Sequence, residues 1–434
     1  MQSQSKYRKE GSPHINFFYL VILVMSNHRK SSSKCNTRKK LRCRKQRDPC
    51  DPDPCNCCNP CNPCNICNTC KCNPCNCCNI VCCCNPPVVT TGRFMQTNLV
   101  SSGFVAAPTI DPTLINAWGI ASNGTFLYVS AADSQAINVY NVNGTVARPP
   151  IPVLPGASGT PASPTGLVLN TSGGYLVNGS PATVLVATEA GTVNAFNSTT
   201  GSAVVKIDNS LTGIANYKGL AITPSLLYLA DFSTSPLGGS IDVFNSAFLP
   251  APQPVQTAPS PFAGQPAFVD PNIPLGFAPF NVAVINGLVY VLYARKNPAD
   301  PSEDLPGPGN GFINIFTPTG NFVRRFASGG VLNSPWGITL APNFSGLNPT
   351  DILVGNFGDG TINVFNFAGT FVSKLQDCSG SPIIIPGLWG LTTSPLNASS
   401  IYFAAGPLDE TAGLVGVLTP CPNNPVFCCS FVCC

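Results

Sequence analysis

The sequence predicts an all-β fold: a six-bladed β-propeller with four-stranded blades, preceded by a cysteine-rich head. Two observations lead to this prediction. A unit of about fifty residues recurs six times between residues 93 and 420, and repeats of this length with four strands each are typical of propeller blades. The 434 residues also include 44 prolines and 39 glycines but only 10% charged residues, which favours short strands and turns over helices.

The first landmark of each unit is an apolar phrase around a glycine, such as NAWGIA (116–121) or SPWGITL (334–340). We expect this phrase to form the innermost strand, a, because glycine suits positions where strands crowd around a central channel. The steps between successive central residues are 47, 53, 62, 56 and 53 residues. These central residues are Gly119, Gly166, Gly219, Asn281, Gly337 and Gly390.

The second landmark is a pair of strands, b and c, followed by a short strand d. In GDGTINVFNFAGTFVSKL, which begins at Gly358, the run TINVF alternates with a period of two residues, as a strand does. The turn NFAG then places Asn and Gly where a hairpin needs unusual backbone angles. Related runs in the other units predict the same order of strands in each blade.

The ring is predicted to close through the start of the propeller segment. The sixth unit lacks a strand d, because GLVGVLTP (413–420) is followed by the irregular CPNNP. An unpaired run, RFMQTNLV (93–100), precedes the first unit and matches NFVRRFASGG (321–330), a predicted strand d. We therefore predict that Phe94–Val100 supplies the outer strand of the sixth blade and removes an exposed edge.

Charge and cysteine content divide the chain near residue 87. Residues 1–87 hold 14 of the 23 Lys and Arg and 4 of the 19 Asp and Glu, a net charge of +10; the remainder has 9 and 15, a net charge of −6. Seventeen of the 23 cysteines lie between Cys35 and Cys84. We divide the chain into an N-terminal segment (1–34), a basic and cysteine-rich tract (35–87), the propeller (88–420) and a cysteine-rich tail (421–434).

The N-terminal segment contains a short apolar run, Ile15–Met25. Its eleven residues are too few to span a membrane as a helix, which needs roughly 20. One interpretation is a signal-peptide core or a short membrane anchor at the N-terminus. The other is an apolar segment that is not exported, because the basic residues of HRK follow almost at once.

The tract that follows begins with a basic run, Arg38–Arg47, and continues with Cys-Asn-Pro repeats, Cys50–Cys84. The basic run could contact nucleic acid or an anionic surface through charge alone, or form a solvated arm. The repeats offer little apolar surface, so only cross-links would order them. Disulfides, including self-cross-linking between molecules, are one interpretation; Zn²⁺ or Cu⁺ on the thiolates and unstructured thiols are the others.

Two further cysteines flank the last unit. Cys378 lies in the link before it, and Cys421 follows it directly. We predict a disulfide between them, or between Cys378 and another cysteine of the tail; the alternative is an inert thiol, since a nucleophilic Cys378 would have no local base.

The start of the propeller segment also suggests a family. QTNLVSSGFVAAPTIDPTLINAWGIA (96–121), with the repeated WGI, LYV and INVFN motifs after it, resembles a family of secreted, mostly bacterial, uncharacterised NHL-like propeller proteins. This resemblance covers about residues 94–420 and excludes the head. The Cys-Asn-Pro tracts resemble those of surface or virion proteins of large DNA viruses. These resemblances imply an extracellular, surface or virion-associated protein.

One face of the ring is the expected binding surface. In a four-stranded meander the b–c loops and the d–a links emerge together, and loops on a rigid scaffold often carry function. The basic pair Arg295 and Lys296 lies there, and a protein or a glycan is the expected ligand. Solvent loops also collect charge without any function. The acidic residues of these loops are Asp133, Glu189, Asp231, Asp300, Glu303, Asp304, Asp359, Asp409 and Glu410.

The sequence is compatible with two functions. We expect a non-enzymatic binding or structural module that is tethered by its cysteine-rich ends and needs no cofactor. The alternative is a metal-dependent hydrolase or lyase at the acidic channel mouth, since some six-bladed relatives hold Ca²⁺ or Zn²⁺ there. Histidine is absent after His28, which excludes His-based acid–base catalysis in the propeller. The candidate metal ligands are Asp133, Glu189, Asp231, Asn281 and Asn356.

Overall fold

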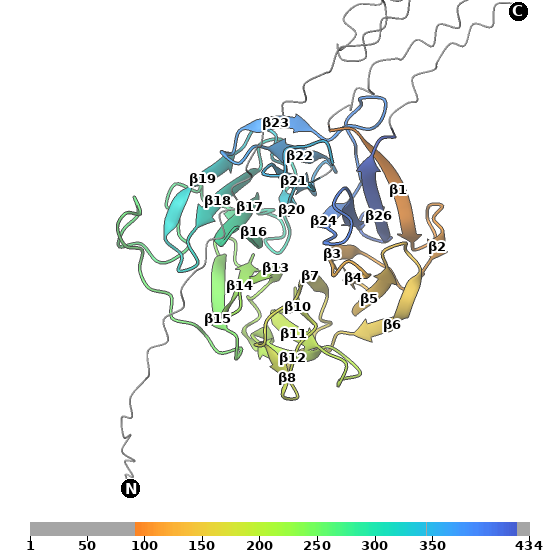
Figure 1. Cartoon of the computed structure of the whole chain (residues 1–434). Coiled ribbons are helices and arrows are strands. Elements are labelled where there is room, and N and C mark those ends of the chain that lie inside the picture. The colour runs from red at the N-terminus through yellow and green to blue at the C-terminus, as the bar shows by residue number, and fades with distance from the viewer. Residues whose placement is uncertain (1–91, 344, 423–434) are drawn as a thin grey trace, which may run out of the picture. The chain divides into compact units, whose positions relative to one another are not determined.

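The computed structural model describes residues 92–343 and 345–422. In this part of the chain, six sheets surround a central axis, and one small hairpin is added to them (Figure 1). The predicted six-bladed propeller is therefore confirmed. The apolar run Ile15–Met25, the basic run Arg38–Arg47 and the tract Cys50–Cys84 lie outside the described residues.

Each blade is an antiparallel sheet whose first strand is innermost. Blade 1 contains β3 (Ala117–Ser122), β4 (Phe126–Ala131), β5 (Ala136–Asn141) and β6 (Val146–Pro152). Blade 2 contains β7 (Pro164–Leu169), β10 (Val184–Thr188), β11 (Thr192–Phe196) and β12 (Val204–Asp208). Blade 3 contains β13 (Tyr217–Ile222), β14 (Leu226–Asp231) and β15 (Ser240–Asn245).

The second half of the ring repeats this order. Blade 4 contains β16 (Phe277–Ile285), β17 (Leu288–Arg295), β18 (Gly311–Phe316) and β19 (Phe322–Ser328). Blade 5 contains β20 (Pro335–Leu340), β21 (Ile352–Asn356), β22 (Ile362–Phe365) and β23 (Phe371–Lys374). Blade 6 contains β24 (Leu388–Thr393), β25 (Ile401–Ala405), β26 (Leu414–Pro420) and β1 (Phe94–Ser101).

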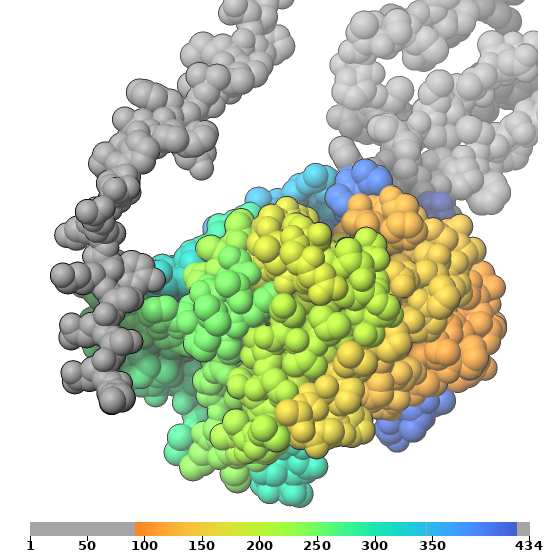
Figure 2. All heavy atoms as spheres, turned by 90° about the horizontal axis from the view of Figure 1, so that it is seen from below, coloured from red at the N-terminus to blue at the C-terminus, as the bar shows by residue number. Residues whose placement is uncertain are grey.

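Short elements decorate the blades. A two-residue strand, β2 (Thr109–Ile110), pairs in parallel with β1. The strands β8 (Leu176–Val177) and β9 (Ser180–Pro181) form the added hairpin, and η2 (Ser210–Thr212) is a single 3₁₀ turn. Seen from the side, blades 2 and 3 form one continuous outer surface (Figure 2).

Blade 3 departs from the prediction of four strands in every blade. After β15 the sheet continues only through an isolated bridge between Phe244 and Pro250. The strand d expected here is therefore replaced by a long irregular link. Prolines at 250, 252 and 254 do not by themselves explain this, because β6 of blade 1 forms an outer strand with Pro149, Pro150 and Pro152.

The ring closes as the sequence predicts. β1 pairs antiparallel with β26, from Phe94 opposite Pro420 to Ser101 opposite Leu414 (Figure 1). Phe94 is fully buried in a hydrophobic cluster with Leu375 and Leu388, which belong to the segments around blades 5 and 6. The first strand of the propeller thus completes the last blade and seals it against its neighbour.

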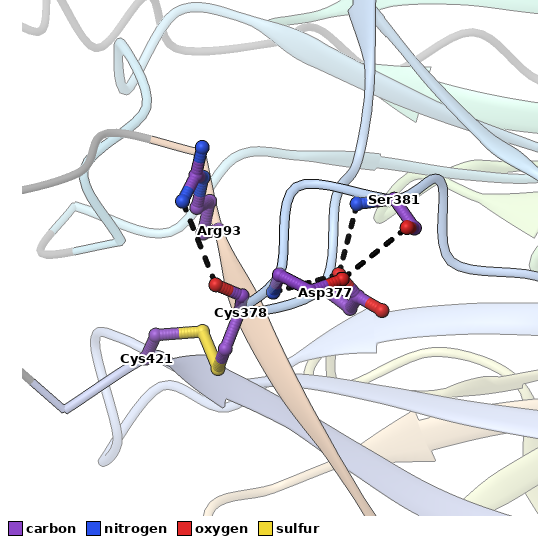
Figure 3. Close-up of a disulfide and its surroundings, with 6 residues drawn as sticks. Arg93, Asp377, Cys378, Ser381 and Cys421 are labelled. Atoms are coloured by element: carbon purple, nitrogen blue, oxygen red, sulfur yellow. Dashed lines mark hydrogen bonds between the residues drawn. A yellow bond between two sulfur atoms is a disulfide. The ribbon is translucent and has the colours of Figure 1, made fainter.

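The two ends of the propeller lie side by side at the seam between blades 5 and 6. The backbone N–H of Cys421 donates to the carbonyl of Arg93 over 3.0 Å. A disulfide joins Cys421 to Cys378, with their Cα atoms 5.7 Å apart (Figure 3). The Arg93 guanidinium also donates to the Cys378 carbonyl at 3.5 Å. The backbone at Arg93 and the backbone at Cys421 therefore lie at one seam of the ring.

A β-bulge recurs at the same place in all six innermost strands. In β3, for example, Trp118 and Gly119 together lie opposite the single residue Ser130. The register of β7, β13, β16, β20 and β24 shifts at the corresponding residues. A bulge re-aims side chains locally, so it changes which residues face the channel.

In five of the six bulges a glycine permits close contact with the next blade. A Cβ atom on Gly390 would lie 2.6 Å from the carbonyl oxygen of Trp118, and one on Gly337 would lie 2.6 Å from that of Trp389. Contacts this short exclude a side chain. The glycine phrases therefore mark the positions where neighbouring innermost strands touch.

Among the described residues, no helix has the length and apolar character required to cross a membrane.

Candidate binding site at the channel mouth

A ring of six side chains, one from each blade, lies at the start of the innermost strands. Each member is the residue that precedes the central glycine, or Asn281 in blade 4. All six are buried, with at most 4% of their surface exposed. The ring residues are Trp118, Thr165, Lys218, Phe280, Trp336 and Trp389.

Aromatic contacts join this ring into one cluster. The rings of Trp118 and Trp389 stack with centroids 3.5 Å apart, and Trp336 meets both edge-on at 6.0 and 5.6 Å. Phe357, from a b–c loop, stacks on the other side of Trp389 at 3.8 Å. Stacked and edge-on pairs are the favoured aromatic geometries. The cluster fills the channel at the face of the b–c loops.

Lys218 is the one charged member of the ring, and its side chain is fully buried. Its Nζ atom donates to Glu189, lies 3.6 Å from Glu303, and sits 5.2 Å above the Trp118 ring. A buried ammonium group is tolerated only when such partners replace its water. Burial alone would lower the pKa of Lys218, but Glu189 and Glu303 outweigh burial and hold it above its usual value.

Further carboxylates surround this ammonium group. Glu410 accepts a hydrogen bond from the Trp389 indole over 3.0 Å, and burial together with the nearby Glu303 raises the pKa of Glu410 to about 7. Burial and the nearby Glu189 raise the pKa of Asp133. Glu189 and Glu303 thus pair with one ammonium group, and with Glu410 and Asp133 nearby the channel mouth carries an excess of negative charge at neutral pH.

The loop that carries Glu410 has a strained backbone. Leu408, Asp409 and Glu410 have φ values of 57°, 50° and 65°, all in the left-handed region that costs L-residues roughly 1–2 kcal/mol each. The Thr411 hydroxyl donates to the Leu408 carbonyl over 2.6 Å and helps to fix the turn. The turn leaves Asp409 exposed and holds Glu410 against Trp389.

Of the two basic residues expected on this face, Arg295 is exposed but Lys296 is not. Lys296 is buried, and its Nζ atom donates to the carbonyls of Phe232, Ser233 and Pro301 at 2.5, 2.6 and 2.8 Å. Burial lowers the pKa of Lys296 to about 8. The prediction that Arg295 and Lys296 form a basic surface pair is therefore wrong for Lys296, whereas Arg295 is exposed.

Two acidic residues of the expected face instead fix their own loops. Asp231 accepts the backbone N–H groups of Asn216 and Ser233, both over 2.8 Å, and burial raises its pKa to about 6. Asp359 accepts the Thr361 hydroxyl over 2.7 Å and lies 3.8 Å from the Lys374 ammonium group.

The five candidate metal ligands do not form one ligand set. The Asn281 amide donates to the Trp336 carbonyl over 2.7 Å, and the Asn356 amide donates to the Val331 carbonyl over 2.8 Å. Both side chains therefore bridge neighbouring segments. Across residues 92–343 and 345–422, no three His, Cys, Asp or Glu side chains are placed to share a metal ion. Glu189 instead binds the ammonium group of Lys218.

Lys218 was not predicted as a site residue, although the sequence contains a signal for it. The residue before the central glycine is Trp in three phrases and Phe in a fourth, but Lys in YKGLAI (217–222). A lone lysine at a position that is otherwise mostly aromatic needs a counter-charge if the position is buried. The carboxylates of the b–c loops were the candidates for this counter-charge.

The fold and this site define a class of protein: a six-bladed propeller whose channel is plugged by its own aromatic and lysine side chains beneath an acidic mouth. The chain is 36% identical over 331 residues to uncharacterized protein L690 of Acanthamoeba polyphaga mimivirus, covering 74% of this chain and 84% of that protein. It is also 36% identical over 340 residues to uncharacterized protein R648 of the same virus, covering 76% and 80%. The chain belongs to the family of these viral proteins.

This membership corrects the expectation of a mostly bacterial family, because these relatives are proteins of a giant virus. No protein-family model matches the chain.

Solved structures with a similar chain path are far more distant in sequence. A streptogramin B lyase is 13% identical with a TM-score of 0.41, covering 75% of this chain and 97% of that one. The soluble aldose sugar dehydrogenase of Escherichia coli is 9% identical with a TM-score of 0.47, covering 76% and 100%. Likenesses of this size carry no information on activity.

Proposed function

We propose that this protein is a non-enzymatic binding module, held at a surface or in a particle by its cysteine-rich ends. Its ligand, a protein or a glycan, docks on the b–c loop face around the channel mouth. The observation that carries the proposal is Lys218, whose ammonium group pairs with Glu189 and Glu303, carboxylates that a metal ion at the channel mouth would need as ligands. The aromatic ring beneath it leaves no passage for a substrate from this face.

The tethering part of the proposal rests on where the ends leave the ring. Cys421 and Arg93 are hydrogen-bonded neighbours, so head and tail start from the same seam. Cys84 is only nine positions before Arg93, and Cys428 is seven positions after Cys421. Cross-links through both segments would therefore hold the ring by one edge and leave the b–c loop face open. The site of attachment is an extracellular surface or a virion, and Arg38–Arg47 adds affinity for an anionic surface or nucleic acid.

Metal analysis of the purified full chain separates this function from the hydrolase or lyase alternative. We expect no metal ion in stoichiometric amount. The metal content should also stay the same when Glu189 is replaced by Gln. One bound Ca²⁺ or Zn²⁺ per chain that is lost in Glu189→Gln would favour the enzyme.

Electrophoresis without reductant tests the tether. We expect covalent multimers in the particle-derived protein that collapse to one band on reduction. A variant with serine in place of the four tail cysteines, Cys428, Cys429, Cys433 and Cys434, should form fewer multimers. A monomer unaffected by reductant would contradict the tether and leave the binding face to be tested separately.

A further inference from the structure

We propose that the channel beyond the ring is a binding well for a small uncharged molecule. The space there measures about 330 Å³ and is lined by residues from all six innermost strands. Trp336 and the glycines 119, 166, 337 and 390 lie at its deep end, and Leu169, Ile222 and Val284 lie near the ends of their strands. The well is thus separate from the channel mouth and does not depend on the function proposed for that face.

The ring residues make the well blind at one end. Trp118, Trp336 and Trp389 are in mutual contact, and each is at most 4% exposed. A ligand could therefore enter only from the opposite face, where the a–b turns lie. The closed end limits how far a ligand can enter, as in a shaped binding pocket.

The wall of the well carries no charged side chain; its side chains are mostly aliphatic, with Trp336, Asn281 and Thr392 among them. Ala121, Ile222 and Ile338 line it and are half-buried, so they expose apolar surface inside a concave space. Removing such surface from water favours binding of an apolar body. Burial of an ion without a counter-charge is costly, which excludes charged ligands.

Backbone groups supply the polar part of the well. Each innermost strand lies at the end of its sheet, so one of its edges faces the channel without a partner strand. At the level of the ring, side chains occupy some of these groups: Ser130 donates to the Thr165 carbonyl, and Asn281 donates to that of Trp336. Farther from the ring the side chains of the lining are mostly aliphatic, which leaves backbone groups free for a hydroxyl or carbonyl of the ligand.

These features define the ligand class. A volume of about 330 Å³ corresponds to roughly ten water molecules, which lies at the small end of ligand pockets. The expected ligand has an apolar or aromatic body, one or two oxygen functions and no charge.

The well can be tested with the uncharged fluorescent probe N-phenyl-1-naphthylamine. All three tryptophans of the chain belong to the ring, and Trp336 lines the well. Energy transfer from tryptophan to the probe therefore reports binding at this place. We expect saturable binding of one probe per chain, with competition by 1-naphthol but not by 1-naphthalenesulfonate.

Two substitutions that fill the well provide the mutational test. Ala121→Phe and Ala283→Leu should each weaken probe binding at least ten-fold without changing the melting temperature of the full chain by more than a few degrees. Val372→Phe, at a 55% exposed position on β23, is the matched control and should bind like the natural protein. If one filling variant fails to fold, the other still decides the test. Unchanged binding in a folded filling variant, equal competition by the sulfonate, or no saturable binding would overturn the proposal.

Discussion

The two ends of the channel are built by the same six strands, yet they offer opposite chemistry. At the mouth, Lys218 pairs with Glu189 and Glu303 beside the buried aromatic rings. In the well, mostly aliphatic side chains line a space without charged groups. The boundary between them is the β-bulge, which turns one side chain per blade into the channel. A small backbone irregularity, repeated six times, thus divides one channel into two environments.

The largest effect is expected from removing the charge at the centre of the mouth. Lys218→Met should lower the free energy of unfolding by about 2–3 kcal/mol, because breaking a buried ion pair leaves carboxylates without a partner. The loss stays below that of a fully enclosed pair because Glu189 and Glu303 can reach water, with side chains 29% and 49% exposed. Urea unfolding at pH 7.5 measures this loss in the free energy of unfolding.

Lys374→Met is the control for this substitution. Lys374 pairs with Asp359 at 3.8 Å on the surface, where such pairs contribute little, so its loss should stay below about 1 kcal/mol. Equal losses in the two variants would show that Lys218 is not a buried structural cation.

The close contact of neighbouring innermost strands at the β-bulge is tested by adding one methyl group. Gly390→Ala should cost about 2 kcal/mol, because its Cβ would approach the Trp118 carbonyl to 2.6 Å and push blades 6 and 1 apart. Thermal unfolding measures the loss. Gly173→Ala, where a Cβ meets nothing within 4 Å, should be neutral. A neutral Gly390→Ala would mean that the innermost strands are not in contact.

The smallest effect concerns the pH dependence of the mouth. The pKa of Glu410 is raised in the folded state to about 7, so folding is favoured by protonation and stability falls as the pH rises from about 4.5 to 7. Glu410→Gln keeps an acceptor for the Trp389 indole but removes this titration. The variant should be more stable than the natural protein at pH 8, by on the order of 1 kcal/mol, and similar at pH 4.5. Unfolding curves at both values check this, and a constant difference across pH would refute it.

The fold could be predicted from the sequence because its signals are local and repeated. The glycine phrases, the alternation in runs such as TINVF and the unpaired strand before residue 101 were enough for six blades and their closure. The missing fourth strand of blade 3 could not be predicted from prolines 250, 252 and 254, because β6 of blade 1 is an outer strand that also contains three prolines.

The site was harder to predict, because it depends on geometry that no single unit reveals. A period of two residues does not show where a bulge interrupts it, so the side chains that enter the channel could not be assigned. Asp231, Asn281 and Lys296 were expected at a surface or metal site, but their polar atoms are occupied by hydrogen bonds between neighbouring segments. The pairing of Lys218 with Glu189 and Glu303 joins three consecutive blades, so no single repeat unit contains it.

The central claim is that the ammonium group of Lys218 is enclosed at the channel mouth. Amine labelling of the folded full chain with acetic anhydride, read by peptide mass spectrometry, tests it most directly. We expect Lys218 to be labelled at least ten-fold more slowly than Lys374, whose side chain is 32% exposed, and at the same rate once the protein is unfolded. Equal labelling of the two lysines in the folded protein would contradict the claim.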